Sequence, residues 1–459
     1  MYFEDTIVAP ATPPGRGAIA IVRLSGPRAI QIALKLWHPA HPSAPIPRHL
    51  YLGEIRDPQT GRTLDRSMCV IMPGPRSMTG EDVAELHCHG GAYLVRKIVA
   101  LATTEGARLA QPGEFSRRAF LNGRIDLTEA EAIADLIDAR DAIALSQSAA
   151  QLVGALSTRI KRLRQQVIAI RAHLEAAIDF SDEEIDLPSS ETVAAQIVAL
   201  KADLSILHQS FERGRIIREG VRAAIVGKPN VGKSSILNLL LGVERAIVTA
   251  KPGTTRDLIE ESVNLGESSL VLIDTAGIRE SCEEVEQIGI ARSRATAQHA
   301  DLLIAVFDSS GALDREDLEI IQLTEERRGF ALLNKNDLPQ NISIADLQRN
   351  GLKLHVLNFS AANGDGLSQC KEALARLVED LTETAVGSEV VISRERHRDA
   401  LGAALDALNL AFEGLRQRMP PEIVALDVGL VAESLGLITG EVSTEDILDA
   451  IFREFCIGK

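Results

Sequence analysis

The sequence predicts a multidomain protein that combines α+β, all-α and α/β domains, with the α/β domain inserted into the all-α domain. Its 459 residues exceed what one ordinary hydrophobic core supports and suggest about three domains. Helically spaced apolar residues occur in two stretches that are far apart in the chain. Between them lies a series of short apolar runs that each end in a polar motif, which is typical of a parallel sheet with a ligand site at its strand ends.

Residues 1–122 form the predicted N-terminal α+β domain. Its short apolar runs, such as 18–24 and 68–72, lie between Pro and Gly residues, as strands do. Arg23 and Glu85 interrupt two such runs. Charges in nearly buried strands are rare unless they are paired or face a ligand, so both are candidate binding residues. The His87-Cys88-His89 sequence matches no closed zinc site, and we expect no metal there.

Two helical stretches, residues 123–214 and 382–459, flank the predicted insertion at 215–381. Neither stretch is expected to bury its apolar face alone, so we expect the two to pack together in one helical domain. The last helix is predicted to start at Ser443, with Asp446 completing a pair that resembles a capping box.

The inserted domain begins with a phosphate-binding motif. The apolar run 221–226 leads into residues 227–234, GKPNVGKS, which fit the Walker A pattern. In this pattern the N–H groups at a helix start face a phosphate, Lys233 reaches the β- and γ-phosphates, and the Ser234 hydroxyl ligates Mg²⁺. A glycine-rich turn without a ligand is the alternative, but three companion motifs follow in the expected order.

Each companion motif follows an apolar run. Residues 274–277, DTAG, supply an aspartate for the Mg²⁺ shell and a glycine N–H for the γ-phosphate. Residues 334–337, NKND, end in Asp337, whose carboxylate accepts from the two N–H groups on the guanine edge that adenine lacks. Ser360-Ala361 stands where such domains close over the base. The four motifs together predict a Ras-like P-loop GTPase domain.

The residues that would perform hydrolysis are less evident. Thr255 is the candidate switch threonine that completes the Mg²⁺ shell, although a polar surface loop explains its surroundings as well. Ile278 stands where Ras-type enzymes have a glutamine that orients water. Glu286 is the in-chain candidate for that task, and a solvated helix start explains the acidic stretch around it equally well. No arginine finger is evident, and the Asn230 side-chain carbonyl offers a ligand for a monovalent cation.

Composition limits the partners. A net charge of −15 argues against binding nucleic acid by bulk electrostatics, and 3% aromatic residues argue against a base-stacking surface. Five scattered cysteines, the lack of a signal peptide and the lack of a membrane-spanning apolar run predict a reduced, cytoplasmic protein that uses no membrane.

Several segments together resemble the MnmE (TrmE) family of tRNA-modification GTPases. They are residues 14–19, 79–86, 112–115 and 118–127, the GTTRD sequence at 253–257, and the terminal Cys456-Ile457-Gly458-Lys459. The resemblance covers essentially the whole chain. It implies that the N-terminal domain binds a tetrahydrofolate derivative (the 5-formyl or 5,10-methylene form) and forms a homodimer, and that the GTPase domains associate across the dimer when K⁺ is present.

The resemblance also implies a reaction. With the FAD-containing protein MnmG, in a heterotetramer, the family adds an aminomethyl or carboxymethylaminomethyl group to carbon 5 of the wobble uridine of certain tRNAs. Tetrahydrofolate supplies the one-carbon unit, and glycine or ammonium supplies the amine.

Roles for individual residues follow from the resemblance. GTP contacts are expected from Asn230, Val231, Gly232, Lys233, Ser234, Ser235, Thr249, Ala250, Lys251, Pro252, Gly253, Thr254, Thr255, Asp274, Thr275, Ala276, Gly277, Asn334, Lys335, Asp337, Ser360 and Ala361. Mg²⁺ is expected at Ser234 and Thr255, and K⁺ at Asn230, Thr249, Lys251 and Thr254. The catalytic candidates are Glu286, Lys233 and Cys456. Folate is expected at Arg23, Glu85, Arg124 and Lys459, with Arg124 standing where many relatives have lysine.

Two other functions are compatible with a GTPase of this kind. The first is ribosome assembly, with flanking domains that bind ribosomal RNA, but the acidic balance and the lack of a basic KH-like module disfavour it. The second is a folate-binding module in which GTP hydrolysis only gates dimerisation.

Overall fold

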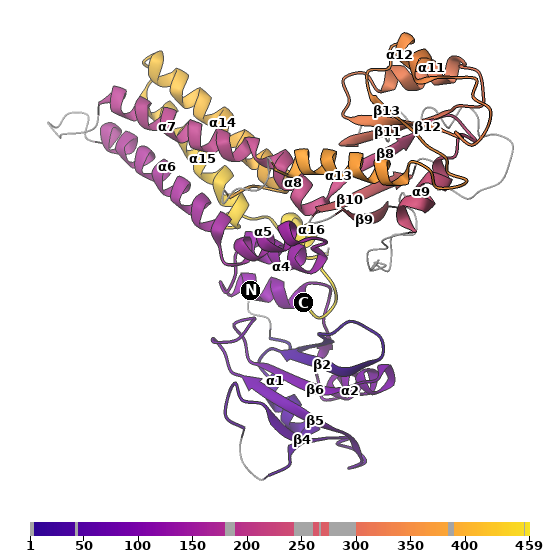
Figure 1. Ribbon diagram of the computed structural model, residues 1–459. Coiled ribbons are helices and arrows are strands. Elements are labelled where there is room, and N and C mark those ends of the chain that lie inside the picture. Colours follow the sequence, from indigo (N-terminus) through magenta and orange to yellow (C-terminus); the bar gives the residue numbers. More distant parts are fainter. Residues whose placement is uncertain are drawn as a thin grey trace. The chain divides into compact units, whose positions relative to one another are not determined.

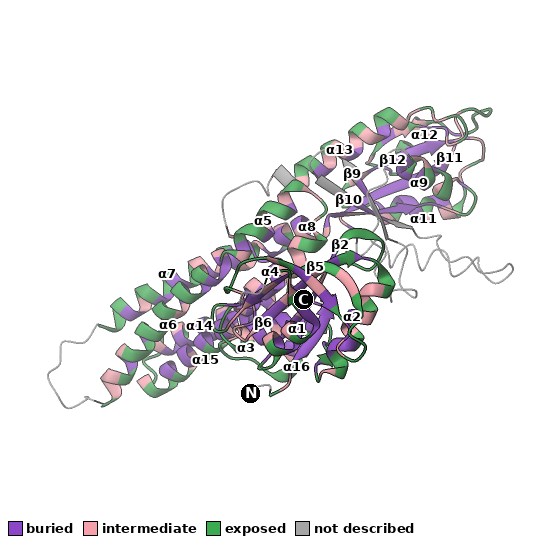
Figure 2. Cartoon of the chain, turned by 90° about the horizontal axis from the view of Figure 1, so that it is seen from below, coloured by how far each residue is buried: buried purple, intermediate pink, exposed green. Residues whose placement is uncertain are grey.

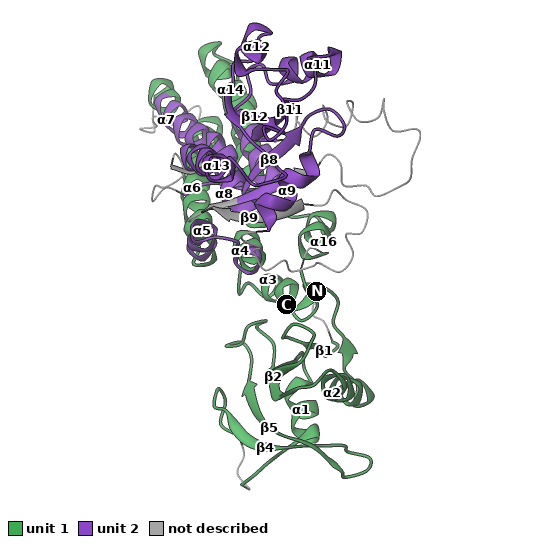
Figure 3. Cartoon of the chain, turned by 45° about the vertical axis from the view of Figure 1, so that its right-hand side comes forward, with its two compact units in different colours: residues 1–134, 151–194, 406–459 green, residues 135–150, 195–405 purple. Residues whose placement is uncertain are grey.

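The computed structural model describes residues 4–41, 45–179, 189–242, 260–265, 268–274, 300–383, 390–453 and 455–459 (Figure 1). The chain divides into two compact units (Figure 3). Unit 1 comprises residues 1–134, 151–194 and 406–459, and unit 2 comprises residues 135–150 and 195–405. Both units are therefore built from segments that are distant in the sequence.

Unit 1 contains a seven-stranded sheet with the order β3-β4-β5-β6-β2-β1-β7. The strands are β1 (Ile7–Pro10), β2 (Gly17–Ser25), β3 (Trp37–Pro39), β4 (Tyr51–Arg56), β5 (Thr63–Met72), β6 (Val83–Gly90) and β7 (Arg108–Leu109). Neighbouring strands are antiparallel, except that β7 pairs parallel to β1. The two apolar runs used to predict strands are thus parts of β2 and β5.

The helices α1 (Ala29–Leu36) and α2 (Ala92–Thr104) pack on one face of this sheet. Val22 and Leu24 of β2 and Leu86 of β6 belong to the core that these helices cover. Because side chains alternate along a strand, Arg23 and Glu85 project to the opposite face. The same alternation therefore places both charged candidates on one surface of the sheet.

The rest of unit 1 is helical. It includes α3 (Glu114–Leu121), α6 (Ala155–Asp179), α15 (Pro421–Thr439) and α16 (Glu445–Arg453). The helices α6 and α15 pack closely along their length, and both bury apolar residues at helical spacing. They come from the two sides of the predicted insertion, so the two helical stretches do pack together. The exact domain boundaries stay a prediction.

Four helices cross the division between the two units: α4 (Leu127–Asp138), α5 (Ala142–Leu152), α7 (Ser190–Gln209) and α14 (Glu395–Arg416). The start of α16 differs from the prediction. The helix begins at Glu445, and the Thr444 hydroxyl, not that of Ser443, accepts a hydrogen bond from the Ile447 N–H at 3.4 Å. Two adjacent hydroxyl residues both suit a cap, and in the structure Thr444 takes this position.

Unit 2 contains a six-stranded sheet with the order β13-β12-β11-β8-β10-β9. The strands are β8 (Val221–Val226), β9 (Glu260–Leu265), β10 (Ser268–Asp274), β11 (Leu302–Asp308), β12 (Gly329–Asn334) and β13 (His355–Asn358). All pairs are parallel except β9 with β10. The helices are α8 (Phe211–Glu219), α9 (Lys233–Leu241), α11 (Arg315–Leu323), α12 (Ile344–Arg349) and α13 (Leu367–Glu383).

Helices cover both faces of this parallel sheet. One apolar core joins it to α9 and α13, and a second joins it to α11 and α12. The central strands β8 and β11 are accordingly buried almost throughout, and β11 is drawn purple in Figure 2. The apolar runs that preceded the four motifs are strands β8, β10, β12 and β13, so the α/β prediction for the inserted domain is confirmed.

A largely buried ion network in unit 1 is centred on Arg118 of α3. The Arg118 side chain is fully buried and contacts three carboxylates: Asp5 (2.7 Å), Glu114 (3.0 Å) and Glu81 (3.2 Å). Burial by itself would raise the pKa of Glu114, but hydrogen bonds from Arg108, the Gln111 N–H and Arg118 outweigh it and lower the pKa. This carboxylate is therefore ionised at neutral pH, and its contribution to stability is lost as pH falls through its lowered pKa.

Replacing Arg118 by Met should destabilise unit 1 by about 3–5 kcal/mol at neutral pH, because it removes a fully buried cation that contacts three carboxylates, of which Asp5 and Glu114 keep Arg108 as a partner. Trp37, the single tryptophan, is buried in this sheet, so its fluorescence during urea unfolding reports on the affected region. The deficit should shrink as pH falls through the lowered pKa of Glu114, because a protonated carboxyl no longer needs the cation. The exposed Arg96→Met variant is the matched control and should change stability by less than about 0.5 kcal/mol. Equal unfolding curves for the two variants would contradict the network's role.

Candidate functional site

The phosphate loop lies between β8 and α9. Its backbone is left-handed at Asn230 (φ 61°) and Gly232 (φ 100°). A side chain at Gly232 would place its Cβ 2.3 Å from Nδ2 of Asn334, so only glycine fits there. The Lys233 ammonium donates to the carbonyls of Gly227 and Lys228, both at 2.8 Å. Ser234 and Ser235 are exposed in the first turn of α9, where backbone N–H groups have no helical acceptor.

The predicted base-recognition residues meet this loop. Asn334 donates to the Val231 carbonyl (2.6 Å) and accepts from the Ala361 N–H (2.9 Å). Ser360 donates to the Asp337 carboxylate, which orients that carboxylate. Lys335, with a left-handed φ of 64°, contacts Asp308 at 2.6 Å. Three of the motifs read from the sequence therefore form one connected cluster.

The remaining nucleotide-site predictions cannot be placed. Thr249, Ala250, Lys251, Pro252, Gly253, Thr254, Thr255, Thr275, Ala276, Gly277 and Glu286 lie outside the described residues. Asp274 is described by its backbone, which pairs with Ile225 at the end of β10. The proposed magnesium, potassium and water-orienting roles all stay predictions, and the structure describes only Asn230 and Ser234 among the residues that would carry them.

A second cluster forms on the face of the unit 1 sheet opposite α1 and α2. Arg23 Nε lies 2.7 Å from Glu85 Oε1, and His87 Nε2 lies 3.2 Å from Glu85 Oε2. Burial by itself would raise the pKa of Glu85, but His87 and Arg23 together hold it below its usual range. The two charges that interrupt apolar strands are therefore paired with each other. Sequence reasoning missed His87, although its spacing of two from Glu85 puts both on one strand face.

The C-terminal tail reaches the same cluster. Arg23 donates to the Gly458 carbonyl at 3.4 Å, and the Phe115 N–H donates to the Lys459 carbonyl at 3.2 Å. Gly458 has φ 99°, and a Cβ there would lie 1.9 Å from the Pro10 carbonyl, so the close approach requires glycine. Cys456 is exposed. The first and last parts of the chain thus meet at one place in unit 1.

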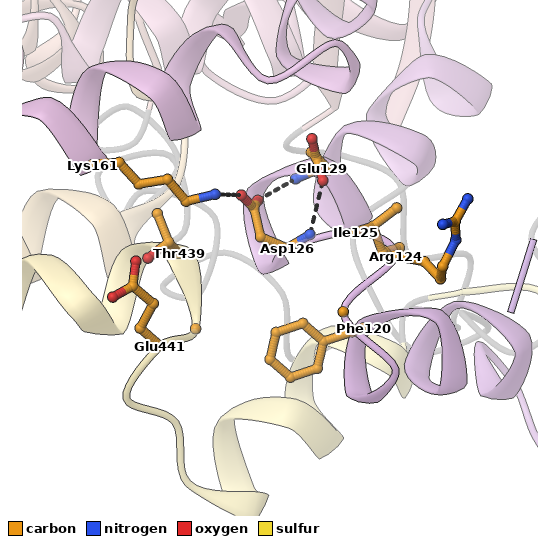
Figure 4. Close-up of a pocket in the computed structure, with 10 residues that line it drawn as sticks. Phe120, Arg124, Ile125, Asp126, Glu129, Lys161, Thr439 and Glu441 are labelled. Atoms are coloured by element: carbon orange, nitrogen blue, oxygen red, sulfur yellow. Dashed lines mark hydrogen bonds and ion pairs between the residues drawn. The ribbon is translucent and has the colours of Figure 1, made fainter. Parts of the chain in front are cut away.

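Arg124 does not join this cluster. It lines a separate cavity of about 270 Å³ between α3, α4, α6 and the end of α15 (Figure 4). There Asp126 caps α4 and contacts Lys161 at 3.1 Å, whereas Arg124 points away from this pair (Figure 4). Among the described residues the Arg124 side chain has no hydrogen-bond or ion-pair partner, so its proposed contact with folate stays a prediction.

Comparison with known proteins now decides the family. A family model described as "MnmE helical domain" matches residues 127–456, and one described as "GTP-binding protein TrmE N-terminus" matches residues 6–124. The chain belongs to the MnmE (TrmE) family. It is 42% identical over 457 residues to the tRNA modification GTPase MnmE of Natranaerobius thermophilus, covering 99% of this chain and 100% of that protein. The MnmE of Clostridioides difficile is also 42% identical, over 462 residues and 100% of both chains.

Among solved structures, the G domain of the T. maritima FeoB iron transporter is 28% identical and matches 34% of this chain and 98% of that domain, with a TM-score of 0.27. Among the helices that the structure describes, none combines the length and apolar composition that crossing a membrane requires.

The Asp337→Asn variant of this MnmE-family chain should lose GTP affinity by a factor on the order of 10² or more, because an amide cannot accept from both guanine N–H groups. The same variant should gain affinity for xanthosine triphosphate, whose edge carries an acceptor in place of the amino group. Titration of labelled nucleotides measures both changes. An unaltered preference for guanine would show that Asp337 does not contact the base.

Proposed function

We propose that this chain hydrolyses GTP as a step in tRNA modification. The contacts between the phosphate loop and the base loop are evidence for GTP binding. Membership of the MnmE family is evidence for a role in tRNA modification. The single observation that carries the proposal is the Asn334 side chain, which joins Val231 of the phosphate loop to Ala361 of the base loop. These two hydrogen bonds hold the phosphate loop and the base loop close enough to contact the same nucleotide.

We further propose the modification itself: with MnmG, which carries FAD, the chain adds a carboxymethylaminomethyl or aminomethyl group to carbon 5 of the wobble uridine. A tetrahydrofolate derivative would supply the one-carbon unit. The Arg23–Glu85 cluster fits such a group, because an ionised carboxylate suits the donor edge of a pterin and nearby cations suit carboxylates. Lys459 and Cys456 belong to the tail that reaches this cluster.

The metal ions of the proposed mechanism fit the phosphate loop as far as it is described. The exposed Ser234 hydroxyl suits Mg²⁺, and the exposed, left-handed Asn230 presents a side-chain carbonyl that suits K⁺. A monovalent cation there would supply the positive charge that an arginine finger gives in other GTPases. We propose that Thr249, Lys251, Thr254 and Thr255 complete these sites and that Glu286 orients water.

The proposed assembly is a homodimer through the N-terminal domain that joins MnmG in a heterotetramer, acts on tRNA and works in the cytoplasm. Association of two GTPase domains would exclude water from the site, which strengthens electrostatic stabilisation of the transition state.

GTP turnover should be faster in KCl than in NaCl at equal ionic strength, by about 10-fold or more if the ion replaces an arginine finger. The Asn230→Ala variant should lose this preference while it still binds GDP. Phosphate release under steady-state conditions measures both. Equal rates in the two salts would remove potassium from the mechanism and leave the nucleotide assignment standing.

Cells that lack this chain should lose the carbon-5 modification of the wobble uridine, because no other step of the proposed reaction delivers that group. Mass analysis of nucleosides from purified tRNA detects the loss, and a plasmid copy of the wild-type chain should restore it. A normal nucleoside profile in the deletion strain would refute the tRNA assignment and favour one of the alternative functions.

A further inference from the structure

Lys228 is a phosphate-loop residue for which the Walker A mechanism supplies no role. Its ammonium contacts the carboxylates of Asp314 (2.7 Å) and Asp317 (2.8 Å). The Lys228 side chain is 16% exposed and that of Asp317 is 2% exposed. A solvated lysine would gain little from such a contact, since exposed ion pairs contribute about 0–1 kcal/mol. Here the partner is buried, so loss of the cation would leave a buried carboxylate unpaired.

Both carboxylates sit on a fixed element. Asp314 caps α11, and Asp314 and Asp317 form a reciprocal capping box: the Asp317 N–H donates to Asp314 (3.1 Å) and the Asp314 N–H to Asp317 (3.2 Å). One turn later, Ile320 and Ile321 of α11 are buried in the core on that face of the unit 2 sheet. The anchor for Lys228 therefore lies on a helix that is packed against the unit 2 sheet.

The main chain of the same residue contacts the candidate catalytic lysine. The Lys228 carbonyl accepts from the Lys233 ammonium at 2.8 Å, together with the carbonyl of Gly227. Pro229 follows directly, so rotation about φ is blocked at the next residue. Lys228 thus connects α11 to Lys233, through its side chain at one end and its carbonyl at the other.

The charges support this connection. Burial tends to lower the pKa of Lys228, but the hydrogen bonds that it donates to Asp314 and Asp317 outweigh burial and raise the pKa above its usual value. Lys228 therefore keeps its positive charge across the range in which the protein works. Burial raises the pKa of Asp317, which Lys228 opposes.

We propose that Lys228 is a positioning residue for GTP hydrolysis, which fastens the phosphate loop to α11 and thereby holds the Lys233 ammonium where the β- and γ-phosphates bind. This inference rests on the proposed GTPase function. It assigns to the second residue of the motif a task that concerns the geometry of Lys233 rather than contact with the nucleotide.

The test compares Lys228→Met with wild type. Methionine approximates the unbranched aliphatic part of the lysine side chain and carries no charge. The phosphate loop therefore loses its contact with α11, while its glycines are unchanged. We expect kcat to fall about 10-fold and GDP affinity to change by less than about threefold, because the loss concerns an interaction used in the transition state. Lys228→Arg, whose guanidinium can contact both carboxylates, should recover most of the turnover.

Asp317→Asn provides an independent variant on α11 that leaves the Lys228–Asp314 pair in place. It should slow turnover less than K228M does, and the double variant K228M/D317N should be no slower than K228M, because D317N weakens the same connection that K228M removes. Lys353→Met removes an exposed lysine of the same unit and should leave kcat unchanged. Thermal unfolding of each variant checks that the domain is folded, and D317N carries the test if K228M is not.

Turnover of K228M at the wild-type rate would overturn the inference. So would a loss that appears only in nucleotide affinity, or losses in K228M and D317N that multiply in the double variant. A wild-type protein that does not hydrolyse GTP would instead refute the proposed function, so the two failures are distinguishable.

Discussion

The hydrogen bond from Asn334 to the Val231 carbonyl is the constraint on which the nucleotide site depends. It joins the end of β12 to the phosphate loop after β8, and these strands are separated in the sheet by β11. The same side chain accepts from Ala361 after β13, so one amide connects three loops. The carboxyl ends of parallel strands meet at one edge of a sheet, and this amide fixes their loops there. Glycine at 232 is required because the amide approaches so closely.

The N-terminal part of unit 1 uses charge in a comparable way. Arg118 holds Asp5, Glu81 and Glu114 in a buried network, and Glu114 begins the helix whose second residue, Phe115, receives the C-terminal Lys459. The network therefore also positions the helix start to which the C-terminal residue is hydrogen-bonded. Arg23 continues this arrangement by linking Glu85 to Gly458. In both units, charged side chains hold a loop or tail against a packed element, and this gives the candidate sites a defined geometry.

Much of this architecture could be read from local pattern. The apolar runs before the motifs at 227–234, 274–277, 334–337 and 360–361 are strands of one sheet, because such runs cannot remain in solvent and their polar ends mark a ligand edge. The pairing of α6 with α15 followed from the need to bury apolar helix faces. The cap of α16 was placed one residue early, at Ser443 instead of Thr444, since two adjacent hydroxyl residues are equally suited to a cap. Arg124 was assigned to folate binding by resemblance; the structure places its side chain at a cavity separate from the Arg23–Glu85 pair, and the assignment stays a prediction.

The sequence by itself determined the secondary structure of the GTPase core, the identity of its nucleotide motifs and the faces on which Arg23 and Glu85 lie, because side-chain periodicity and backbone chemistry are local properties. Only the tertiary structure decided that Arg23 pairs with Glu85 and with a carbonyl more than 400 residues later, that Asn334 contacts the phosphate loop, and that Lys228 is anchored on α11. These contacts depend on which segments the chain brings together, and no local period encodes the partner of a side chain across a fold.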